Sequence, residues 1–367
     1  MTEITTTSEV LTDIKSLMPD ELTEYVKSLG EKAFRGAQLF EWMHARRVKS
    51  IDEMTNLPKN LRQKLKDSCT YTVVEKEEKL ISAIDGTEKY LLRMQDGNVV
   101  EAVLMRYEHG LSICISSQVG CRMGCRFCAS TIDGRVRDMT AAEMLEEVYC
   151  VQREHPDERI SHVVLMGSGE PLDNFDNVVR FIKLICDEKG FGMSRRNITL
   201  STCGLVPKIR ELADLDLKIT LALSLHAPDD ETRRKTMPIA NKYSIDEILS
   251  ACSYYFDKTG RRVTFEYALI AGLNDSKAQA QKLASVIHPL HAHINLIPVN
   301  HVEERDYKRS DGRDIRAFKN ILESKGINVT IRREMGRDIA GACGQLRRSF
   351  TKGDALADPR EEEKEDI

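Results

Sequence analysis

The most constraining feature of this 367-residue chain is a regular alternation of strand-like and helix-like stretches that begins at Leu111. A strand followed by a helix and a further strand predicts parallel strands joined by crossover helices. Six or seven such units favour a complete or partial (β/α) barrel over an open doubly wound sheet. In a barrel, functional side chains lie at the carboxyl ends of the strands. The predicted strands are LSICIS, HVVLM, NITLS, KITLALS, RVTFEYALI, HINLIPV and NVTIR.

The residues before this alternation follow other patterns and are predicted to be accessory to the barrel. Apolar positions at helical spacing predict a small N-terminal helical domain over residues 1–70. The period then changes to alternation, and Asp85-Gly86 and Asp96-Gly97 are typical of hairpin turns. We therefore expect a small antiparallel β extension over 71–105, the barrel over 106–352 and an acidic disordered tail over 353–367.

Composition and charge fit a soluble chain in a reducing compartment. There is no apolar run long enough to span a membrane, and MTEITTTSEV lacks the layout of a secretory signal. We therefore expect a cytoplasmic protein without a membrane partner, and reduced rather than disulfide-bonded cysteines. The tail from Asp354 to Asp366 holds seven acids and two bases, which leaves the rest of the chain slightly positive. Paired bases there, such as Arg233-Arg234, are compatible with phosphate contacts or with ordinary solvated surface.

Three of the ten cysteines form one tight cluster just after the first barrel strand. Cys121, Cys125 and Cys128 follow a C-x3-C-x2-C spacing, and no fourth cysteine or histidine lies close by in the sequence. Three thiolates on an iron–sulfur cubane leave one iron open to a cofactor or substrate. The spacing resembles that of the radical S-adenosylmethionine superfamily. The alternative is a structural zinc knuckle completed by a distant ligand.

Polar or glycine-rich segments follow several later strands. Gly169-Glu170 lies in the loop MGSGEPL after the second strand, and in this superfamily such a segment meets the cofactor through its backbone. A tight strand-to-helix turn would explain the glycines equally well. The remaining candidate S-adenosylmethionine-binding residues end the third, fourth and sixth strands: Ser201, Ser224, Leu225, His226 and Asn300.

The motifs together resemble one family over nearly the whole chain, from about Phe34 to Arg348. They are VVEAVLMR, CISSQVGC-RMGC-RFCAS, MGSGEPL, SLHAP, NLIP-VN and DIAGACGQLR, with FRGAQLFEWM and EMTNLPKNLRQKL before them. This combination is similar to that of the RlmN/Cfr family of RNA adenosine methyltransferases, and specifically of its RlmN type. The resemblance implies an N-terminal helical domain and a partial (β/α)6 barrel. One departure is Ser168, which stands where better-known relatives have methionine.

The resemblance also implies a reaction and the residues that carry it. RlmN-type members methylate C2 of an adenosine in the peptidyl-transferase region of 23S rRNA, and studied members also modify an adenosine beside the anticodon of some tRNAs. Cys343 would take a methyl group from one S-adenosylmethionine, and a second would yield a 5′-deoxyadenosyl radical that activates it. Cys114 would release the methylated base through a transient disulfide, and Glu101 would accept the proton. Two S-adenosylmethionines and one [4Fe–4S] cluster are thus expected.

Two alternatives and several partners remain open from the sequence. The first alternative is a Cfr-type enzyme that methylates C8 of the same adenosine, and the second is a non-catalytic iron–sulfur RNA-binding protein. An electron donor such as flavodoxin or ferredoxin is expected, and the chain is expected to be a monomer. Six N-terminal bases are candidates for gripping RNA phosphates: Arg46, Arg47, Lys59, Arg62, Lys64 and Lys66. Five cysteines match no motif position and are interpreted as structural: Cys69, Cys150, Cys186, Cys203 and Cys252.

Overall fold

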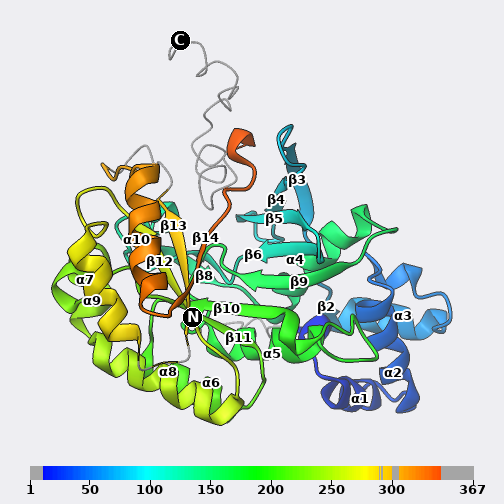
Figure 1. The fold of residues 1–367 in the computed structure, drawn as a ribbon. Coiled ribbons are helices and arrows are strands. Elements are labelled where there is room, and N and C mark those ends of the chain that lie inside the picture. The colour runs from blue at the N-terminus through cyan, green and yellow to red at the C-terminus, as the bar shows by residue number, and fades with distance from the viewer. Residues whose placement is uncertain (1–10, 289, 291, 300–305, 340–367) are drawn as a thin grey trace, which may run out of the picture.

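A ten-stranded mixed sheet organises the computed structural model, which describes residues 11–288, 290, 292–299 and 306–339. The strand order is β14-β13-β12-β11-β10-β9-β6-β5-β4-β3, so the described strands form an open array with β14 and β3 at its edges (Figure 1). Strands β6 and β9 to β14 pair in parallel, and their order follows the chain. The central sheet is therefore a partial barrel, as expected, with a seventh parallel strand beyond the sixth.

All seven predicted barrel strands are present. They are β6 (Gly110–Ile115), β9 (Ile160–Leu165), β10 (Ile198–Thr202), β11 (Thr220–Ser224), β12 (Thr264–Leu269), β13 (His293–Pro298) and β14 (Asn328–Ile331). Alternate residues such as Ile113 and Ile115 are fully buried in the main core under the helices. The residues between them face the opposite side, which is the concave interior of the partial barrel. Several of these interior residues are polar and half-exposed, as expected for a surface that takes up a ligand.

Helices between the strands cover one face of the sheet. They are α4 (Ala141–Glu154), α5 (Phe175–Ile185), α6 (Val206–Asp214), α7 (Asp230–Thr236), α8 (Ile245–Thr259), α9 (Lys277–Ile287) and α10 (Gly312–Ser324). The start of α4 is fixed by a capping box in which Thr140 and Glu143 satisfy each other's backbone N–H groups. Ser244 with Glu247 and Ser276 with Gln279 do the same for α8 and α9. The short helix α7 contains Arg233, which belongs to the site described below.

The antiparallel extension is part of the main sheet rather than a separate small one. Strands β3 (Glu75–Ile81), β4 (Glu88–Arg93) and β5 (Val99–Tyr107) form hairpins whose connections contain the predicted Asp-Gly turns. Strand β5 then pairs antiparallel with β6, the first barrel strand. Because the pairing is continuous, side chains of β5 share a surface with the barrel interior. A separate two-stranded sheet, β7 (Gln118–Gly120) with β8 (Arg135–Asp138), brackets the cysteine loop.

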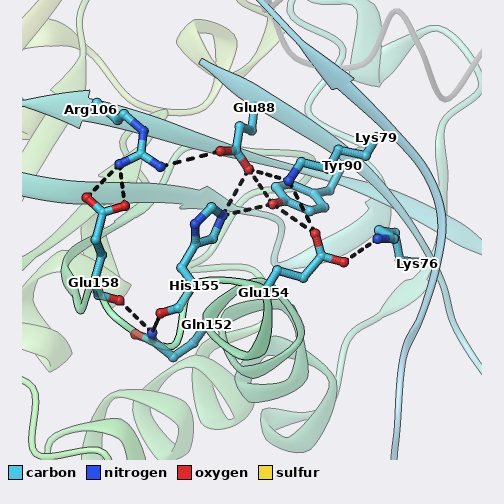
Figure 2. A network of polar contacts seen from close by, with 9 residues as sticks. All are labelled: Lys76, Lys79, Glu88, Tyr90, Arg106, Gln152, Glu154, His155 and Glu158. Carbon is cyan, nitrogen blue, oxygen red and sulfur yellow. Dashed lines mark hydrogen bonds and ion pairs between the residues drawn. The ribbon is translucent and has the colours of Figure 1, made fainter. Parts of the chain in front are cut away.

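A polar network ties this extension to the end of α4 (Figure 2). Glu88 lies at its centre, where its Oε2 accepts from Lys79 Nζ at 2.8 Å and lies 2.9 Å from His155 Nε2. These partners outweigh the effect of burial and lower the pKa of Glu88 to about 2. Arg106, on β5, pairs with Glu158 at 2.6 Å on the loop after α4. The network fixes the position of β4 and β5 against the barrel.

The N-terminal region is helical, with α1 (Pro19–Ser28), α2 (Phe34–Phe40) and α3 (Lys59–Ser68), and with a short parallel pair of β1 (Thr12–Asp13) and β2 (Cys69–Thr70). It packs against α4 through buried polar contacts. Lys15 Nζ lies 2.6 Å from Glu146 Oε1, and neither side chain is exposed. His44 Nδ1 lies 3.0 Å from the hydroxyl of Tyr149 on α4. These contacts attach the N-terminal region firmly to the barrel.

Candidate cluster and cofactor site

The three motif cysteines lie in one loop between β7 and β8. Cys121 donates its N–H to Gly134 O at 3.0 Å, and Thr131 Oγ1 donates to the carbonyls of Cys125 and Cys128 at 2.9 and 3.0 Å. Gly120 has a φ of +75°, and a Cβ there would lie 2.0 Å from Gly134 O, so only glycine allows this closure. The loop is therefore shaped by its own backbone contacts before any cofactor is considered.

The cysteine loop packs on the segment that follows α7. Cys125 belongs to a small buried cluster with Cys203 and Met237, against which Phe127 and Cys128 also pack. The N–H of Arg126 donates to Thr236 O at 2.8 Å. Burial, together with the neighbouring thiols, raises the pKa of Cys121 to about 12 and raises that of Cys125 further. Such buried thiols become thiolates only when a cation compensates their charge, as iron does.

No three His, Cys, Asp or Glu side chains in the described parts of the chain gather so as to hold one metal ion. This finding concerns a site that holds a single metal ion, such as a zinc knuckle, and not an iron–sulfur cubane. In a cubane each cysteine binds a different iron, so the three sulfurs need not converge on one point.

The glycine-rich loop after β9 is packed tightly against the loop after β6. A Cβ at Gly167 would lie 2.6 Å from Ile115 O, and one at Gly169, whose φ is +109°, would lie 2.7 Å from Gln118. The carboxylate of Glu170 is buried and accepts N–H bonds from Cys203 at 2.7 Å and Leu172 at 3.1 Å. Close packing thus accounts for the glycines, and Glu170 joins the loops after β9 and β10.

The predicted residues at the ends of β10 and β11 are neighbours. Ser201 Oγ and Ser224 Oγ lie 3.5 Å apart, both half-buried on the barrel interior. Leu225 and His226 each donate their N–H to Glu266 O, at 3.0 and 3.2 Å. Backbone hydrogen bonds therefore hold the loop after β11 against β12.

His226 is held in an unusual conformation beside the cysteine loop. Its φ is +55°, its Nδ1 accepts the N–H of Ala268 at 2.8 Å, and its ring packs edge-on against Phe127. Burial and the nearby Arg233 lower the pKa of His226 to about 3, so the ring is neutral. A positive φ on a histidine is rare and marks a position fixed by its surroundings.

Arg233 is neither solvated surface nor available for a phosphate contact at the surface, because it lies inside the protein. Its side chain is fully buried, whereas Arg234 beside it is exposed. It donates from Nε to Leu225 O at 3.1 Å and from Nη2 to Cys203 O at 2.6 Å and Ser224 O at 3.2 Å. Nη1 is buried and has no hydrogen-bond partner among the described residues. A buried cation with a spare donor beside Cys125 fits an anionic cluster bound at this loop.

Cys114 and Glu101 lie on one face of the sheet, close to the barrel interior. Cys114 on β6 is paired with Val103 on β5, and Glu101 lies two residues before Val103 on the same face. Cys114 packs with Met166 and Met335, and the charge of Glu101 contributes to its environment. Burial raises the pKa of Cys114 to about 11, while Arg332 opposes this rise. Glu101 is buried and paired with Lys89.

A row of polar side chains crosses the barrel interior and was not predicted. Asn295 Nδ2 donates to Glu266 Oε2 at 2.9 Å, and Thr330 Oγ1 donates to Asn295 Oδ1 at 3.0 Å. His293 Nε2 lies 2.9 Å from Thr330 Oγ1. The sequence does contain a pattern that could have predicted this row, because polar residues occupy alternate positions in β12, β13 and β14. The strand prediction used only the apolar residues of these stretches.

The six N-terminal bases are partly neutralised within their own region. Arg46 pairs with Glu41 at 2.7 Å, Lys64 with Glu31 at 3.0 Å and Lys66 with Asp52 at 2.6 Å. Arg62 donates to Asp52 O at 2.8 Å, and Arg47 donates to Ala45 O. Lys59 is exposed. The predicted methyl carrier Cys343, the predicted cofactor residue Asn300 and the acidic tail lie outside the described residues.

Two family models match this chain. The radical SAM superfamily matches residues 115–284, and the ribosomal RNA large subunit methyltransferase N-terminal domain matches residues 12–70. Within the described helices, none is long and apolar enough to cross a membrane.

Full-length relatives and a solved structure agree with these matches. A "probable dual-specificity RNA methyltransferase RlmN" of Lachnospira eligens is 59% identical over 93% of this chain and 97% of its own length. The corresponding protein of Lachnoclostridium phytofermentans is 57% identical over 92% of this chain and 95% of its own. The crystal structure of a radical SAM methyltransferase from Sphaerobacter thermophilus is 39% identical, covers 91% of this chain and 98% of its own, and has a TM-score of 0.87. The chain belongs to the RlmN family of radical S-adenosylmethionine RNA methyltransferases.

Proposed function

We propose that this protein methylates C2 of an adenosine in the peptidyl-transferase region of 23S rRNA and an adenosine beside the anticodon of tRNAs. Its relatives are named as dual-specificity RNA methyltransferases of the same family. The observation that carries the proposal is the placement of Cys114 and Glu101 on one face of the sheet beside the barrel interior. A protein that only binds RNA needs neither residue.

The family implies a [4Fe–4S] cluster and S-adenosylmethionine. In our proposal Cys121, Cys125 and Cys128 hold the cluster. Residues Gly169, Glu170, Ser201, Ser224, Leu225, His226 and Asn300 are the proposed S-adenosylmethionine-binding residues. Since both carboxylate oxygens of Glu170 already accept backbone N–H groups, this residue would meet the cofactor through its backbone. Ser201 and Ser224, which face the interior, would offer hydroxyl groups.

C2 of adenine is electron-poor and will not attack a sulfonium methyl group, so a radical route is needed. When bound, the cluster and S-adenosylmethionine supply a 5′-deoxyadenosyl radical. The Cys343 thiolate would first take a methyl group, and the methyl carbon, after losing a hydrogen atom, would join C2 of the adenine. The adduct would then lose one electron, which the cluster would take up, and the C2 proton, which Glu101 would accept. The Cys114 thiolate would attack the sulfur of Cys343, so that a sulfur–sulfur bond forms as the carbon–sulfur bond breaks. The electron pair left on the carbon would take up a proton, which completes the methyl group as the base leaves. One turnover uses two S-adenosylmethionines.

The described surroundings of Cys114 suit a thiol that reacts only when its partner arrives. Burial raises its pKa to about 11, so it is protonated at neutral pH and inert as a nucleophile. The guanidinium of Arg332 acts in the opposite direction, since a positive charge favours the thiolate. RNA binding would also require the target base to be turned out of its stack. We propose that the protein works as a cytoplasmic monomer with flavodoxin or ferredoxin as electron donor.

The decisive experiment is anaerobic reconstitution with iron and sulfide, followed by incubation with S-adenosylmethionine, reductant and 23S rRNA fragments or tRNA. We expect 5′-deoxyadenosine and 2-methyladenosine in the same sample, with Cys343→Ala as the inactive control. 8-Methyladenosine would instead identify a Cfr-type enzyme. Methylation that persists in Cys343→Ala would contradict the proposed mechanism, and an intact cluster without either product would contradict the proposed function.

A further inference from the structure

We propose that Arg233 is the buried counter-charge and hydrogen-bond donor of the iron–sulfur cluster held by the cysteine loop. This inference rests on the proposed function, because it takes the cluster to be bound at Cys121, Cys125 and Cys128. It goes further because Arg233 belongs to none of the motifs on which that function was proposed. It concerns a positioning residue that acts on the cluster's electronic state rather than on the substrate.

The first observation is an electrostatic imbalance. Arg233 has no solvent exposure, and the hydrogen bonds of its guanidinium to the described residues go to backbone carbonyls and not to a carboxylate. Three backbone carbonyls accept from Nε and Nη2, and these neutral groups do not cancel its charge. An isolated buried cation is costly, and proteins normally pair such a charge. The described fold therefore retains a buried positive charge that no carboxylate contacts directly, although Asp230 is near enough to act on it.

The second observation concerns the position of an anion that could compensate the charge of Arg233. Arg233 Nη2 donates to the backbone carbonyl of Cys203 at 2.6 Å, which places the guanidinium next to the residues that surround the cysteine loop. Cys125 is a motif cysteine, and Cys203 packs beside it in the same buried cluster. Three thiolates outweigh the positive charge of an oxidised cubane, and reduction adds a further negative charge. A bound cluster would thus supply the anion, and more of it in the reduced state.

The third observation is a spare donor. Nη1 of Arg233 is completely buried and donates to no oxygen, nitrogen or sulfur of the described residues. The planar fork of arginine is fixed here by the carbonyls of the loops after β10 and β11, so the direction of the remaining N–H groups is also fixed. Hydrogen bonds to cluster sulfurs and nearby positive charge both raise the reduction potential of such clusters. Arg233 would ease the entry of the electron that starts the reaction.

The test compares the reduction potentials of reconstituted clusters in Arg233→Met, Arg233→Lys and the wild type, measured by anaerobic redox titration with EPR detection. Arg234→Met is the matched control, because it removes the same charge one residue away on the exposed side of α7. At the potential where half of the wild-type cluster is reduced, the ratio of reduced to oxidised cluster in Arg233→Met should be at least tenfold lower than in the wild type. This ratio corresponds to a reduction potential that is lower by about 59 mV for one electron. Arg234→Met should retain the wild-type potential.

The lysine variant keeps the test decisive if Arg233→Met fails to fold or to bind iron. Lysine retains the charge but cannot satisfy three carbonyls and a sulfur together, so we expect a smaller shift in the same direction. An unshifted potential in whichever Arg233 variants bind the cluster, or an equal shift in Arg234→Met, would overturn the proposal. A wild-type protein that shows no cluster signal after reconstitution would instead contradict the assignment of the cysteine loop.

A thermal unfolding comparison separates this role from a merely structural one. If Arg233 interacts with the cluster, reconstitution should raise the Tm of the wild type more than it raises the Tm of Arg233→Met or Arg233→Lys. A role confined to tying the loops together would lower the Tm of the iron-free and reconstituted proteins by the same amount. Equal losses in both forms would therefore count against the proposal.

Discussion

Lys89 Nζ and Glu101 Oε2 lie 3.1 Å apart, and the two side chains are 0% and 2% exposed. The residues stand on adjacent strands, β4 and β5, in a sheet that continues into the barrel. Glu101 is the proposed proton acceptor. Its ion-pair partner Lys89 belongs to the accessory extension and not to the barrel. The pair links the placement of the extension to the proposed chemistry.

This ion pair yields a prediction about stability. Removing one partner of a buried pair takes this counter-charge away from the other, and the loss typically costs about 3–5 kcal/mol. We expect Lys89→Met to lower the free energy of unfolding by an amount in that range, and Lys89→Met with Glu101→Leu to recover much of the loss. Urea unfolding of the single and double variants measures this coupling. Additive losses in the double variant would show that the two residues do not depend on each other.

Cys114→Ala should block product release without preventing the steps before it. Since Cys114 is the proposed resolving thiol, RNA should remain covalently attached to the protein through Cys343. We expect a slow-migrating RNA–protein species on denaturing gels, together with 5′-deoxyadenosine but little free 2-methyladenosine. Cys252→Ala is the control, because Cys252 is also buried but lies on the core-facing side of helix α8. A free methylated product from Cys114→Ala would argue against the assigned role.

The rate of adduct release should rise with pH. Burial raises the pKa of Cys114 to about 11, so at pH 7 to 9 the reactive thiolate is a small fraction that grows about tenfold per pH unit. Arg332 favours the thiolate, and Arg332→Met should therefore slow release further at a given pH. Single-turnover decay of the adduct between pH 7 and 9 provides the measurement. A rate independent of pH would mean that thiol deprotonation does not limit release.

His44 should make the fold sensitive to acid. Burial against α4 lowers its pKa to about 3, whereas an unfolded histidine titrates near 6.5. Between these values the unfolded state binds the extra proton, so stability present above pH 6.5 is lost as the pH falls towards 3. The slope from this one group is at most about 1.4 kcal/mol per pH unit. His44→Gln should flatten the difference in unfolding free energy between pH 7 and 5, and an unchanged slope would exclude His44 as its source.

The N-terminal bases offer a test of the proposed RNA contact. Lys59 is exposed at the start of α3, and Arg62 lies one turn later on the same helix. We expect the double reversal Lys59→Glu/Arg62→Glu to weaken RNA binding and to reduce the dependence of log Kd on log salt, because fewer phosphates are neutralised. Lys277→Glu, on an exposed end of α9, is the matched control. Equal affinities and salt slopes for all three proteins would remove this surface from the proposal.

Local patterns in the sequence were sufficient to predict the strands of the partial barrel and the position of the cysteine loop after the first of them. Strand β13 and helix α10 can be recognised from the spacing of their apolar residues, because side chains on one face alternate along a strand and recur every three or four residues on a helix. Asp85-Gly86 and Asp96-Gly97 marked the two hairpin connections, since such pairs tolerate the left-handed backbone that these turns require. Family motifs indicated Cys114 and Glu101 but said nothing of their surroundings.

Tertiary structure alone decided which of these residues meet and in what electrostatic setting. Arg233 and Arg234 are identical neighbours in sequence, yet packing buries the first against the ends of β10 and β11 and leaves the second exposed. Glu101 acquires Lys89 as a partner only because β4 and β5 pair in one register. Cys203 comes beside Cys125 across a separation that no local spacing encodes. Burial, charge compensation and pKa depend on distances between elements, whereas periodicity and motifs record only order along the chain.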